Sequence, residues 1–272
     1  IALGRLGIPT GMLTGLSTDM FGVQLAAALT ASHVDISRSV ISNRPTTLAF
    51  VQLKDGQATY SFVDEGSAGR MLTPVDMPPL TADVSALYLG GISLACEPSA
   101  DAYIALLKSE GSTRPVMIDP NIRPAFINDI SAYRSRLEEA MRLVDIVKVS
   151  DEDLDWLVPG PPSLTDKVMA LLELGPAAVI LTQGAQGATG YLKSGAEVKV
   201  PAIRAKVVDT VGAGDTFNAG VLAQLFEAGK LSKAAISDIS PDTLQSAIEF
   251  GAKVAAITVT RAGANPPWAN EI

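Results

Sequence analysis

The sequence has almost no cysteine or histidine, and this scarcity excludes several classes of protein. Its 272 residues include one cysteine, Cys96, and one histidine, His33. A single cysteine cannot form an internal disulfide, and one cysteine with one histidine does not make a zinc-ligand cluster. We therefore expect a protein of a reducing, cytoplasmic compartment, and we assign His33 no role beyond the surface.

Positive charge is also scarce. Lysine and arginine total 21 against 29 aspartates and glutamates, which gives a formal net charge of −8. Nucleic acids and anionic membranes bind clustered Lys and Arg, so neither is an expected partner. If the protein binds an anion, it must hold that anion by local groups.

The chain also lacks a long apolar run. The longest uncharged stretch, residues 174–192, is interrupted by Pro176 and four glycines, which indicates strand, turn and strand rather than a membrane-spanning helix. The first seven residues, IALGRLG, look like the middle of a helix. We expect roughly one βα unit to precede them.

What the chain does contain is an alternation of short apolar runs and amphipathic stretches, which predicts an α/β fold around a largely parallel sheet. The predicted strands are 11–16, 86–90, 115–119, 145–150 and 177–181. The predicted helices are 22–31, 99–109, 131–143, 163–174, 214–228 and 241–256. Residues 47–63 interrupt this order, because Lys54-Asp55-Gly56-Gln57 favours a tight hairpin. Such a hairpin is either an edge extension or a lid over a ligand.

The most informative stretch is DTVGAGDTFNAG, residues 209–220. Residues 206–210 are expected to end a strand, and residues 217–229 to form a helix. At a helix N-terminus the first backbone N–H groups have no intrahelical partner and the dipole is positive. The small residues 212–214 leave these amides open, so this junction is predicted to bind a phosphate-sized anion.

Asp215 follows the small residues directly and lies in the first turn of the predicted helix. A carboxylate at this place would repel a phosphate unless it accepted the proton of a hydroxyl that attacks the phosphorus. The competing interpretation is that Asp215 is a helix cap and the glycines form an ordinary turn.

The twelve-residue motif resembles the C-terminal signature of the ribokinase-like (PfkB) sugar kinases. Residues 15–22 (GLSTDMFG) look like that family's G-x-D-x-x-G stretch, with Ser17 where glycine is usual. Residues 258–268 (TVTRAGANPPW) look like the loop that closes its nucleotide site. The resemblance spans nearly the whole chain. It implies one kinase domain over residues 1–272, a three-layer α/β sandwich with a mainly parallel sheet and a small β lid at about residues 44–66.

The resemblance implies ATP-dependent phosphoryl transfer with Asp215 as the catalytic base. The anion hole would be formed by the amides of Gly212, Ala213 and Gly214. Asp209 and the carbonyl of Val211 would lie near a monovalent cation that many members of the family bind, with K⁺ as the candidate.

The resemblance also implies a nucleotide site that uses Thr182, Gly184, Gly187, Ser150 and Gly263. Residues 181–188 (LTQGAQGA) look like the family's T-x-G-x-x-G-A turn, although by themselves they are equally a hairpin turn. Ser150 and Asp153 stand where the family has an N-x-x-E motif that organises Mg²⁺. An indirect Mg²⁺ role for Asp153 therefore competes with an acidic helix start.

The sugar is indicated by two residues. Asp64, near the end of the expected lid, can accept hydrogen bonds from a neutral sugar but would repel the carboxylate of a sugar acid. Arg123 lies in IDPNIRPAF, a pattern that resembles both fructokinases and sugar-acid kinases, and it either contacts substrate or pairs with Asp119. Residues 64–73 (DEGSAGRMLT) and 260–268 (TRAGANPPW) look most similar to bacterial fructokinases. We therefore expect phosphorylation of fructose at a primary hydroxyl, with 2-keto-3-deoxygluconate and ribose as the alternatives.

Two other classes of function remain to be compared. A Rossmann-type dehydrogenase would need its glycine-rich turn after the first strand, whereas here it lies near the C-terminus. A non-catalytic sugar or nucleotide sensor is disfavoured by the presence of Asp215. It is favoured by the absence of the family's N-terminal strand acid and Gly-Gly-x-x-x-N loop from the sequence. We also expect a homodimer formed through the hairpin, because exposed strands bury an edge by pairing.

Overall fold

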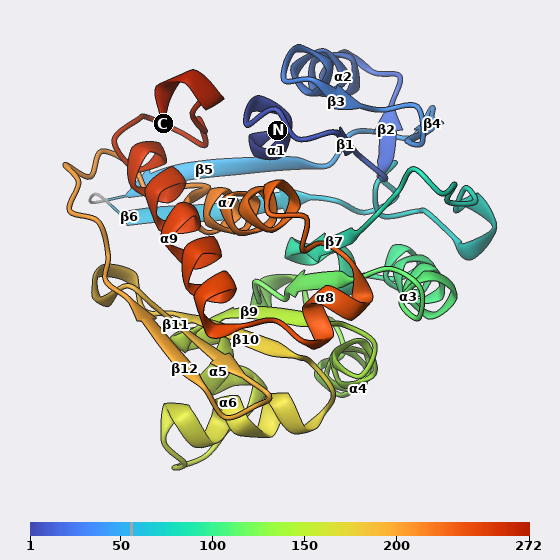
Figure 1. Ribbon diagram of the computed structural model, residues 1–272. Helices are drawn as coiled ribbons and strands as arrows, with labels where there is room; N and C mark the ends of the chain where they lie inside the picture. The colour runs from blue at the N-terminus through green and yellow to red at the C-terminus, as the bar shows by residue number, and fades with distance from the viewer. Residues whose placement is uncertain (55–56) are drawn as a thin grey trace.

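A computed structural model describes residues 1–54 and 57–272. Within these residues the centre of the molecule is a six-stranded sheet with the order β12-β11-β10-β9-β8-β7 (Figure 1). Strands β7 to β10 are mutually parallel, and β11 and β12 are antiparallel to their neighbours. The strands are β7 (Leu87–Gly90), β8 (Val116–Asp119), β9 (Ile146–Ser150), β10 (Ala178–Thr182), β11 (Ala188–Leu192) and β12 (Glu197–Val200).

Helices cover both faces of this sheet, which gives the predicted three-layer α/β arrangement (Figure 1). One face carries α3 (Ser99–Glu110), α4 (Ile130–Met141), α5 (Asp151–Leu157) and α6 (Leu164–Glu173). The other face carries α7 (Ala213–Glu227), α8 (Lys233–Ser237) and α9 (Pro241–Thr258).

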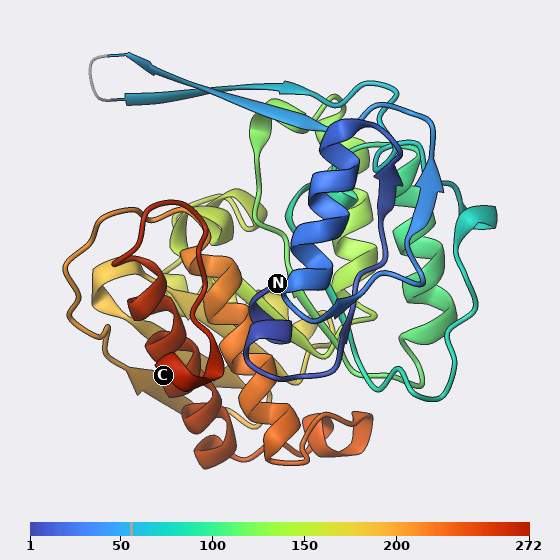
Figure 2. The same cartoon turned by 90° about the horizontal axis from the view of Figure 1, so that it is seen from above.

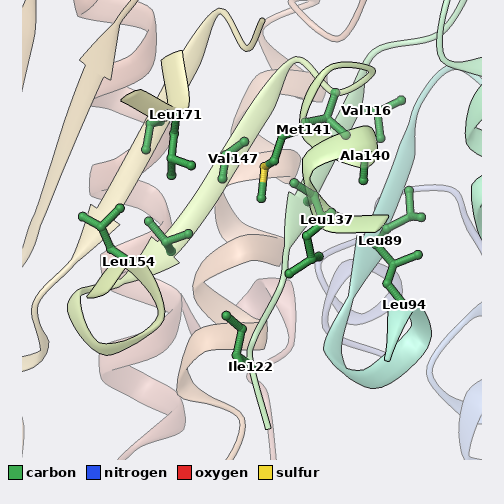
Figure 3. Packing of buried hydrophobic residues seen from close by; sticks show 14 of the residues in the cluster. Leu89, Leu94, Val116, Ile122, Leu137, Ala140, Met141, Val147, Leu154 and Leu171 are labelled. Carbon is green, nitrogen blue, oxygen red and sulfur yellow. The ribbon is translucent and has the colours of Figure 1, made fainter. Parts of the chain in front are cut away.

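Each face has its own apolar core, because successive strand residues point to opposite sides of a sheet. In β9, Val147 packs with the α3–α6 side, where Figure 3 shows it close to Met141 and Leu171. Its neighbour Ile146 packs with the α7–α9 side. A strand buried on both faces is expected to be apolar throughout, so any polar residue within it needs a partner.

The chain before β7 forms smaller units. Two-residue or three-residue strands pair in parallel as β1 (Thr10–Gly11) with β3 (Val34–Asp35) and as β2 (Gly15–Ser17) with β4 (Val40–Ser42). The helices of this part are α1 (Ala2–Arg5), which packs against α7, and α2 (Met20–Ala31). Short 3-10 turns complete the chain at η1 (Pro74–Asp76), η2 (Gly91–Leu94), η3 (Pro124–Phe126), η4 (Gly184–Gln186) and η5 (Ala269–Glu271).

The hairpin predicted over residues 47–63 consists of β5 (Leu48–Lys54) and β6 (Gln57–Val63) in antiparallel register. The two strands form a separate sheet, and Figure 2 shows them extending away from the rest of the molecule. The predicted turn residues Asp55 and Gly56 lie outside the described residues. At the other end, the ring of Phe62 lies 4.3 Å from that of Phe126, between ring centroids.

The base of the hairpin is fixed by two carboxylates. Asp19 caps α2 through the N–H of Gly22, at 2.8 Å, and also accepts the hydroxyl of Thr46, at 2.6 Å. Asp64 accepts the hydroxyl of Thr47, at 2.7 Å. The Asp19 bonds attach the start of the hairpin to α2, and the Asp64 bond joins the two ends of the hairpin to each other.

Two predicted strands are wrong. Residues 11–16 do not form one strand, because the chain bends to pair β1 with β3 and β2 with β4 in separate sheets. Residues 206–210 form no strand, because their backbone is held by the neighbouring loop: the N–H groups of Val208 and Asp209 both donate to the carbonyl of Val259. Across residues 1–54 and 57–272, no helix combines the length and apolarity that a bilayer crossing requires.

Candidate active site

The predicted site residues gather at the carboxyl ends of the parallel strands, where ligands of open α/β sheets bind. Asp119 ends β8, Ser150 ends β9 and Thr182 ends β10. Thr182 lies directly opposite Ser150 in the ladder. The N-terminus of α7, with Asp215 in its first turn, belongs to the same edge because Asn218 of α7 bonds to Asp119.

The N-terminus of α7, like that of α3, has no side-chain cap, whereas those of four other long helices do. Asp19, Asp129, Ser163 and Ser240 cap α2, α4, α6 and α9 by accepting a backbone N–H. The first residue before α7 is Gly212, with φ 78°, and among the described residues no side chain caps the helix. Asp215 is therefore not a cap. The N–H of Ala213 donates to the carbonyl of Thr210 at 3.2 Å, which leaves the amides of Gly212 and Gly214 suited to an anion.

The glycines at 212 and 214 are present for different reasons. Gly212 has a positive φ, and a Cβ on it would lie 2.9 Å from the Cβ of Ala264, so the fold itself requires glycine there. A Cβ on Gly214 would make only an ordinary 3.5 Å contact with Nζ of Lys148. The fold does not require glycine at 214, and the space in front of its amide is consistent with the approach of a ligand.

Asp215 is solvent-exposed, but several charged groups lie close to the part of its side chain that faces the protein. Burial by the surrounding atoms raises the pKa of Asp215, and the nearby carboxylate of Asp119 raises it further. The positive charges of Lys148 and Arg123 lower the pKa again. Because water reaches the exposed side, it screens these effects, and their sum is a pKa above the usual range for an aspartate.

Arg123 lies near enough to Asp215 for their charges to interact, and its side chain is exposed. The alternative pairing of Arg123 with Asp119 is not formed: Asp119 binds Lys148, and Arg123 donates to the carbonyl of Ile122 at 3.0 Å. The N–H of Ile122 in turn donates to Oδ1 of Asp153, at 3.0 Å. Asp153 thus holds the loop that carries Arg123.

Four of the five predicted nucleotide residues lie at or just after the ends of β9 and β10, and their visible contacts are local. The fifth, Gly263, lies on a separate loop. Ser150 caps α5 by accepting the N–H of Asp153, at 3.0 Å. The hydroxyl of Thr182 donates to the carbonyl of Val149, at 3.3 Å. A Cβ on Gly187, where φ is 98°, would lie 2.2 Å from the carbonyl oxygen of Val200. Residues 181–188 do form a hairpin turn between β10 and β11, and their role with a nucleotide stays a prediction.

Asp209 connects the two loops beside the α7 N-terminus. Its carboxylate accepts the N–H of Val211, at 3.0 Å, and that of Gly263, at 2.9 Å. These two hydrogen bonds lower the pKa of Asp209. The loop predicted to close the nucleotide site is therefore tied to the anion-site loop, whereas the monovalent-cation role of Asp209 and Val211 stays a prediction.

Asp64 is buried within a polar cluster. Its Oδ1 accepts the hydroxyls of Thr47 and Ser67, at 2.7 and 3.0 Å, and Arg70 lies 3.7 Å from its Oδ2. This arrangement holds the base of the hairpin. A direct contact of Asp64 with sugar stays a prediction.

The described part of the chain contains no group of three or more His, Cys, Asp or Glu residues placed to hold a metal ion. Mg²⁺ commonly binds one or two carboxylates together with substrate phosphates and water, and Asp153 at this edge is compatible with such a limited role.

The analysis of the sequence missed Lys148. This lysine and Asp119 are buried side by side, with 3.0 Å between Nζ and Oδ2. A signal was readable in the sequence: DIVKVS places a lysine in the middle of a strand that is otherwise apolar, and lysines are almost never fully buried unless they are paired.

Comparison with known proteins identifies the family. A family model described as pfkB family carbohydrate kinase matches residues 1–271. The chain belongs to this family. It is a carbohydrate kinase, a phosphotransferase, with the ribokinase-like fold, and a dehydrogenase is excluded by this assignment.

Several relatives of this kinase are named fructokinases. A fructokinase of Rhizobium leguminosarum bv. trifolii is 48% identical over 247 residues, which cover 90% of this chain and 75% of the relative. A structure titled fructokinase with bound ATP from Xylella fastidiosa matches with a TM-score of 0.87 and 27% identity, covering 97% of this chain and 83% of that one. An aminoimidazole riboside kinase from Salmonella enterica matches with a TM-score of 0.80 and 25% identity, covering 97% of this chain and 84% of that one.

Proposed function

We propose that this kinase transfers the γ-phosphoryl group of ATP to a primary hydroxyl of fructose. The observation that carries the reaction is the α7 N-terminus, which no side chain of the described residues caps and which holds Asp215 in its first turn. The relative that is 48% identical is named fructokinase, and the Xylella fastidiosa structure is titled with bound ATP. Both support this choice of sugar and phosphoryl donor.

In the proposed mechanism Asp215 aims the sugar hydroxyl and accepts its proton. The hydroxyl oxygen forms a bond to the γ-phosphorus while the bond from that phosphorus to the β–γ bridging oxygen breaks, so ADP leaves with the electron pair. The amides of Gly212 and Gly214, and that of Ala213 once it releases the Thr210 carbonyl, stabilise the negative charge on the transferring group. The exposed guanidinium of Arg123 adds positive charge nearby. Such positioning and charge stabilisation account for most of the catalysis of phosphoryl transfer.

The nucleotide is proposed to lie along the edge formed by Thr182, Gly184, Gly187 and Ser150, with Gly263 on the closing loop. Mg²⁺ would be held mainly by the phosphates, with Asp153 acting indirectly. K⁺ would lie near Asp209 and the Val211 carbonyl. Two structures of a Vibrio cholerae fructokinase share this fold. One is titled with a bound potassium ion and the other with a bound calcium ion.

A neutral sugar is favoured over a sugar acid by the charges at the base of the hairpin. Arg70 is the basic residue near Asp64, and its guanidinium already faces that carboxylate at 3.7 Å and donates to the carbonyl of Glu97 at 3.3 Å. A sugar carboxylate would have to compete with Asp64 for this charge. Fructose and ribose avoid that competition, and Asp64 or Arg123 would contact their hydroxyls.

The hairpin also supports a proposal about assembly and setting. Phe50 and Val63 are more than half exposed, at 56% and 52%, which favours the pairing of two hairpins in a homodimer. We place this enzyme in the cytoplasm, in keeping with a substrate and a nucleotide that are found there. Sedimentation velocity at micromolar concentration tests the assembly, and a monomer would contradict it.

The reaction is tested by coupled ADP release from the enzyme with Mg-ATP and fructose, ribose or 2-keto-3-deoxygluconate. We expect turnover with fructose, and Asp215→Asn should lower kcat by about 10²-fold to 10⁴-fold. Preference for the sugar acid would contradict the proposed substrate. Absence of turnover with every sugar, combined with binding of sugar or ATP, would favour a sensor.

A stability measurement separates lost chemistry from lost folding. Because the folded-state pKa of Asp215 lies above its ordinary value, ionisation of this group opposes folding at pH values above the folded pKa, and this effect disappears below the unfolded pKa. Asp215→Asn should therefore melt at or slightly above the wild-type temperature near pH 7, with no difference expected near pH 3, where both forms are neutral. Thermal melts at the two pH values check this sign.

A further inference from the structure

A buried polar cluster lies directly beneath the proposed catalytic base. Nζ of Lys148 is 3.0 Å from Oδ2 of Asp119, and Nδ2 of Asn218 donates to the same oxygen at 2.8 Å and to the hydroxyl of Tyr88 at 3.0 Å. The exposed fractions are 1% for Asp119, 6% for Lys148 and 1% for Asn218. Tyr88, Asp119 and Lys148 come from three adjacent strands and Asn218 from the helix above them.

The alternation of the strands directs this cluster toward α7. Asp119 is two residues after Met117, and Lys148 is two residues after Ile146; both of these apolar residues belong to the core on the α7–α9 side. Side chains two apart in a strand share a face. Lys148 therefore points at the helix that carries the anion site, and not at the opposite layer.

The cluster is close to both functional parts of the site. Nζ of Lys148 lies 3.5 Å from the position that a Cβ on Gly214 would take. Asn218 follows Asp215 by three residues on α7, which places the two on neighbouring positions of the helix surface. The ammonium group thus stands between the Asp119 carboxylate, which it contacts, and the first turn of α7.

Stability alone is a poor explanation for this cluster. Removing a lysine and an aspartate from water is costly, and a buried pair is often no more stable than apolar residues of similar size. Oδ1 of Asn218 also has no hydrogen-bond partner among the described residues, and an unsatisfied buried acceptor carries a further cost. A fold that keeps these groups beside its reaction site is better explained by what they do there.

We propose that Lys148 is a positioning residue for phosphoryl transfer: held by Asp119 and Asn218, its ammonium group keeps the Asp215 carboxylate ionised beside the α7 N-terminus. This inference rests on the function proposed above, because it assumes that Asp215 is the base. It adds a residue of β9 to the site, and it gives Asp119 the role of fixing that residue in place.

The charged and titratable groups that face Asp215 come from several elements. They are Lys148 from β9, Asp119 from β8, Arg123 from the loop after β8, and the neutral phenol of Tyr88 from β7. Burial and then Asp119 raise the pKa of Asp215, whereas Lys148 and Arg123 lower it. Removal of the Lys148 charge should therefore raise this pKa, and removal of the Asp119 charge should lower it.

The test is the pH dependence of kcat and kcat/KM for fructose with Mg-ATP in five forms of the enzyme. These are wild type, Lys148→Met, Lys148→Arg, Asp119→Asn and the double variant Lys148→Met/Asp119→Asn. A base must be ionised to act, so activity falls as the pH drops through its pKa. Since the titration of ATP is common to all five forms, differences between their acid limbs report on the protein.

We expect opposite displacements from the two single charge changes. In Lys148→Met the acid limb should move up by about one pH unit, and in Asp119→Asn it should move down by a similar amount. Lys148→Arg should stay near wild type because it retains the charge, and the double variant should lie between the single ones. An unchanged acid limb in Lys148→Met, or an equal displacement in Lys148→Arg, would overturn the proposal, because a purely structural role gives no such dependence on charge.

Lys148→Met leaves Asp119 buried without its cation, so its folding is checked by circular dichroism and thermal melting. If this variant does not fold, the double variant decides by comparison with Asp119→Asn: an acid limb that lies higher in the double variant supports the proposal, and equal limbs overturn it. A second readout needs no turnover. Carboxyl ¹³C resonances of labelled aspartate, with Asp215 identified by its loss in Asp215→Asn, should show the same signs.

The two readouts distinguish this inference from the proposed function. If the wild type phosphorylates no sugar, or Asp215→Asn retains full activity, the proposed function has failed whatever the carboxyl resonances show. If the wild type is active and Asp215→Asn is not, but neither the acid limb nor the resonance of Asp215 moves in Lys148→Met, only the role of Lys148 has failed.

Discussion

The α7 end of the sheet and the β5–β6 hairpin are held in place by opposite means. At the α7 end, buried groups from two strands and a helix are fixed by direct hydrogen bonds to one another and to Tyr88 of a third strand. In the hairpin the base is held by Asp19 and Asp64, whereas Phe50 and Val63 on its two strands are more than half exposed. The difference suggests a division of labour: phosphoryl transfer requires atoms held to within about 1 Å, and admission of a sugar requires a part that can move.

The largest effect is expected from Gly214→Ala, which tests the α7 end of the sheet. The added Cβ makes an ordinary 3.5 Å contact with Lys148, and alanine favours a helix over glycine by about 1 kcal/mol, so the variant should fold and melt at or above the wild-type temperature. Its methyl group would occupy the approach to the amides, so kcat/KM for ATP should fall about a hundredfold. Steady-state kinetics and a thermal melt measure both quantities.

Gly11→Ala is the matched control, because a Cβ there would meet only the carbonyl oxygen of Asp35, at 3.8 Å. It should leave the kinetics unchanged. Normal ATP kinetics in Gly214→Ala would show that the small residue serves the fold after all.

Gly220→Ala tests the rigidity of the same end through its packing. A Cβ on Gly220 would lie 2.6 Å from the Cα of Gly251, so α7 and α9 would have to separate. Overpacking of this kind typically lowers the free energy of unfolding by about 1–3 kcal/mol. Urea denaturation measures the loss, with Gly69→Ala as the control because its nearest atoms would lie 3.8 Å away. Equal midpoints for the two variants would contradict a tight α7–α9 crossing.

Asp153 connects the two regions, since it holds the loop of Arg123 and that loop leads to Phe126 beneath the hairpin. Asp153→Ala leaves the buried N–H of Ile122 without its acceptor, a loss of about 1–3 kcal/mol, and should lower kcat/KM for the sugar by roughly tenfold. Asp153→Asn retains an oxygen acceptor and should lie close to wild type. If both variants are equally impaired and need more Mg²⁺, the residue acts through its charge on the metal and not through the loop.

Phe62→Ala addresses the hairpin alone and should have the smallest effect. Its ring contacts that of Phe126 at 4.3 Å between centroids, and aromatic pairs contribute about 0.5–1.5 kcal/mol beyond their buried area. We expect KM for the sugar to rise by about twofold to tenfold with little change in kcat. Phe50→Ala changes an exposed residue of the partner strand and should leave this KM unchanged. An equal effect of both changes would argue against a specific Phe62–Phe126 contact.

The sequence predicts most of the fold because periodic patterns carry it. The expected helix 99–109 and strand 177–181 differ by one residue or so from α3 and β10. The prediction of strands fails at 11–16 and 206–210, where distant partners determine the backbone conformation. These partners are β3 and β4 for the first segment and the Val259 carbonyl for the second. A local pattern contains no information about such partners.

The site residues likewise fall into those that a local motif predicts and those that depend on a distant partner. The motif at 209–220 predicts the α7 N-terminus and Asp215, and the structure brings Arg123 near to them. Lys148 was missed because its meaning depends on Asp119, which is 29 residues away in the chain. An apolar strand interrupted by one lysine indicates only that a partner exists, and the fold determines which carboxylate it is.

The order of the strands has a consequence for how the protein is made. β7 to β12 lie in the sheet in the same order as in the chain, so each strand can pair with the one synthesised just before it. Asn218, in contrast, reaches Asp119 across 99 residues, and loop closure over such a distance comes late in folding. On a ribosome, the Lys148–Asp119 pair would therefore be exposed to water until α7 emerges and covers it, and the site would be the last part of the enzyme to be completed.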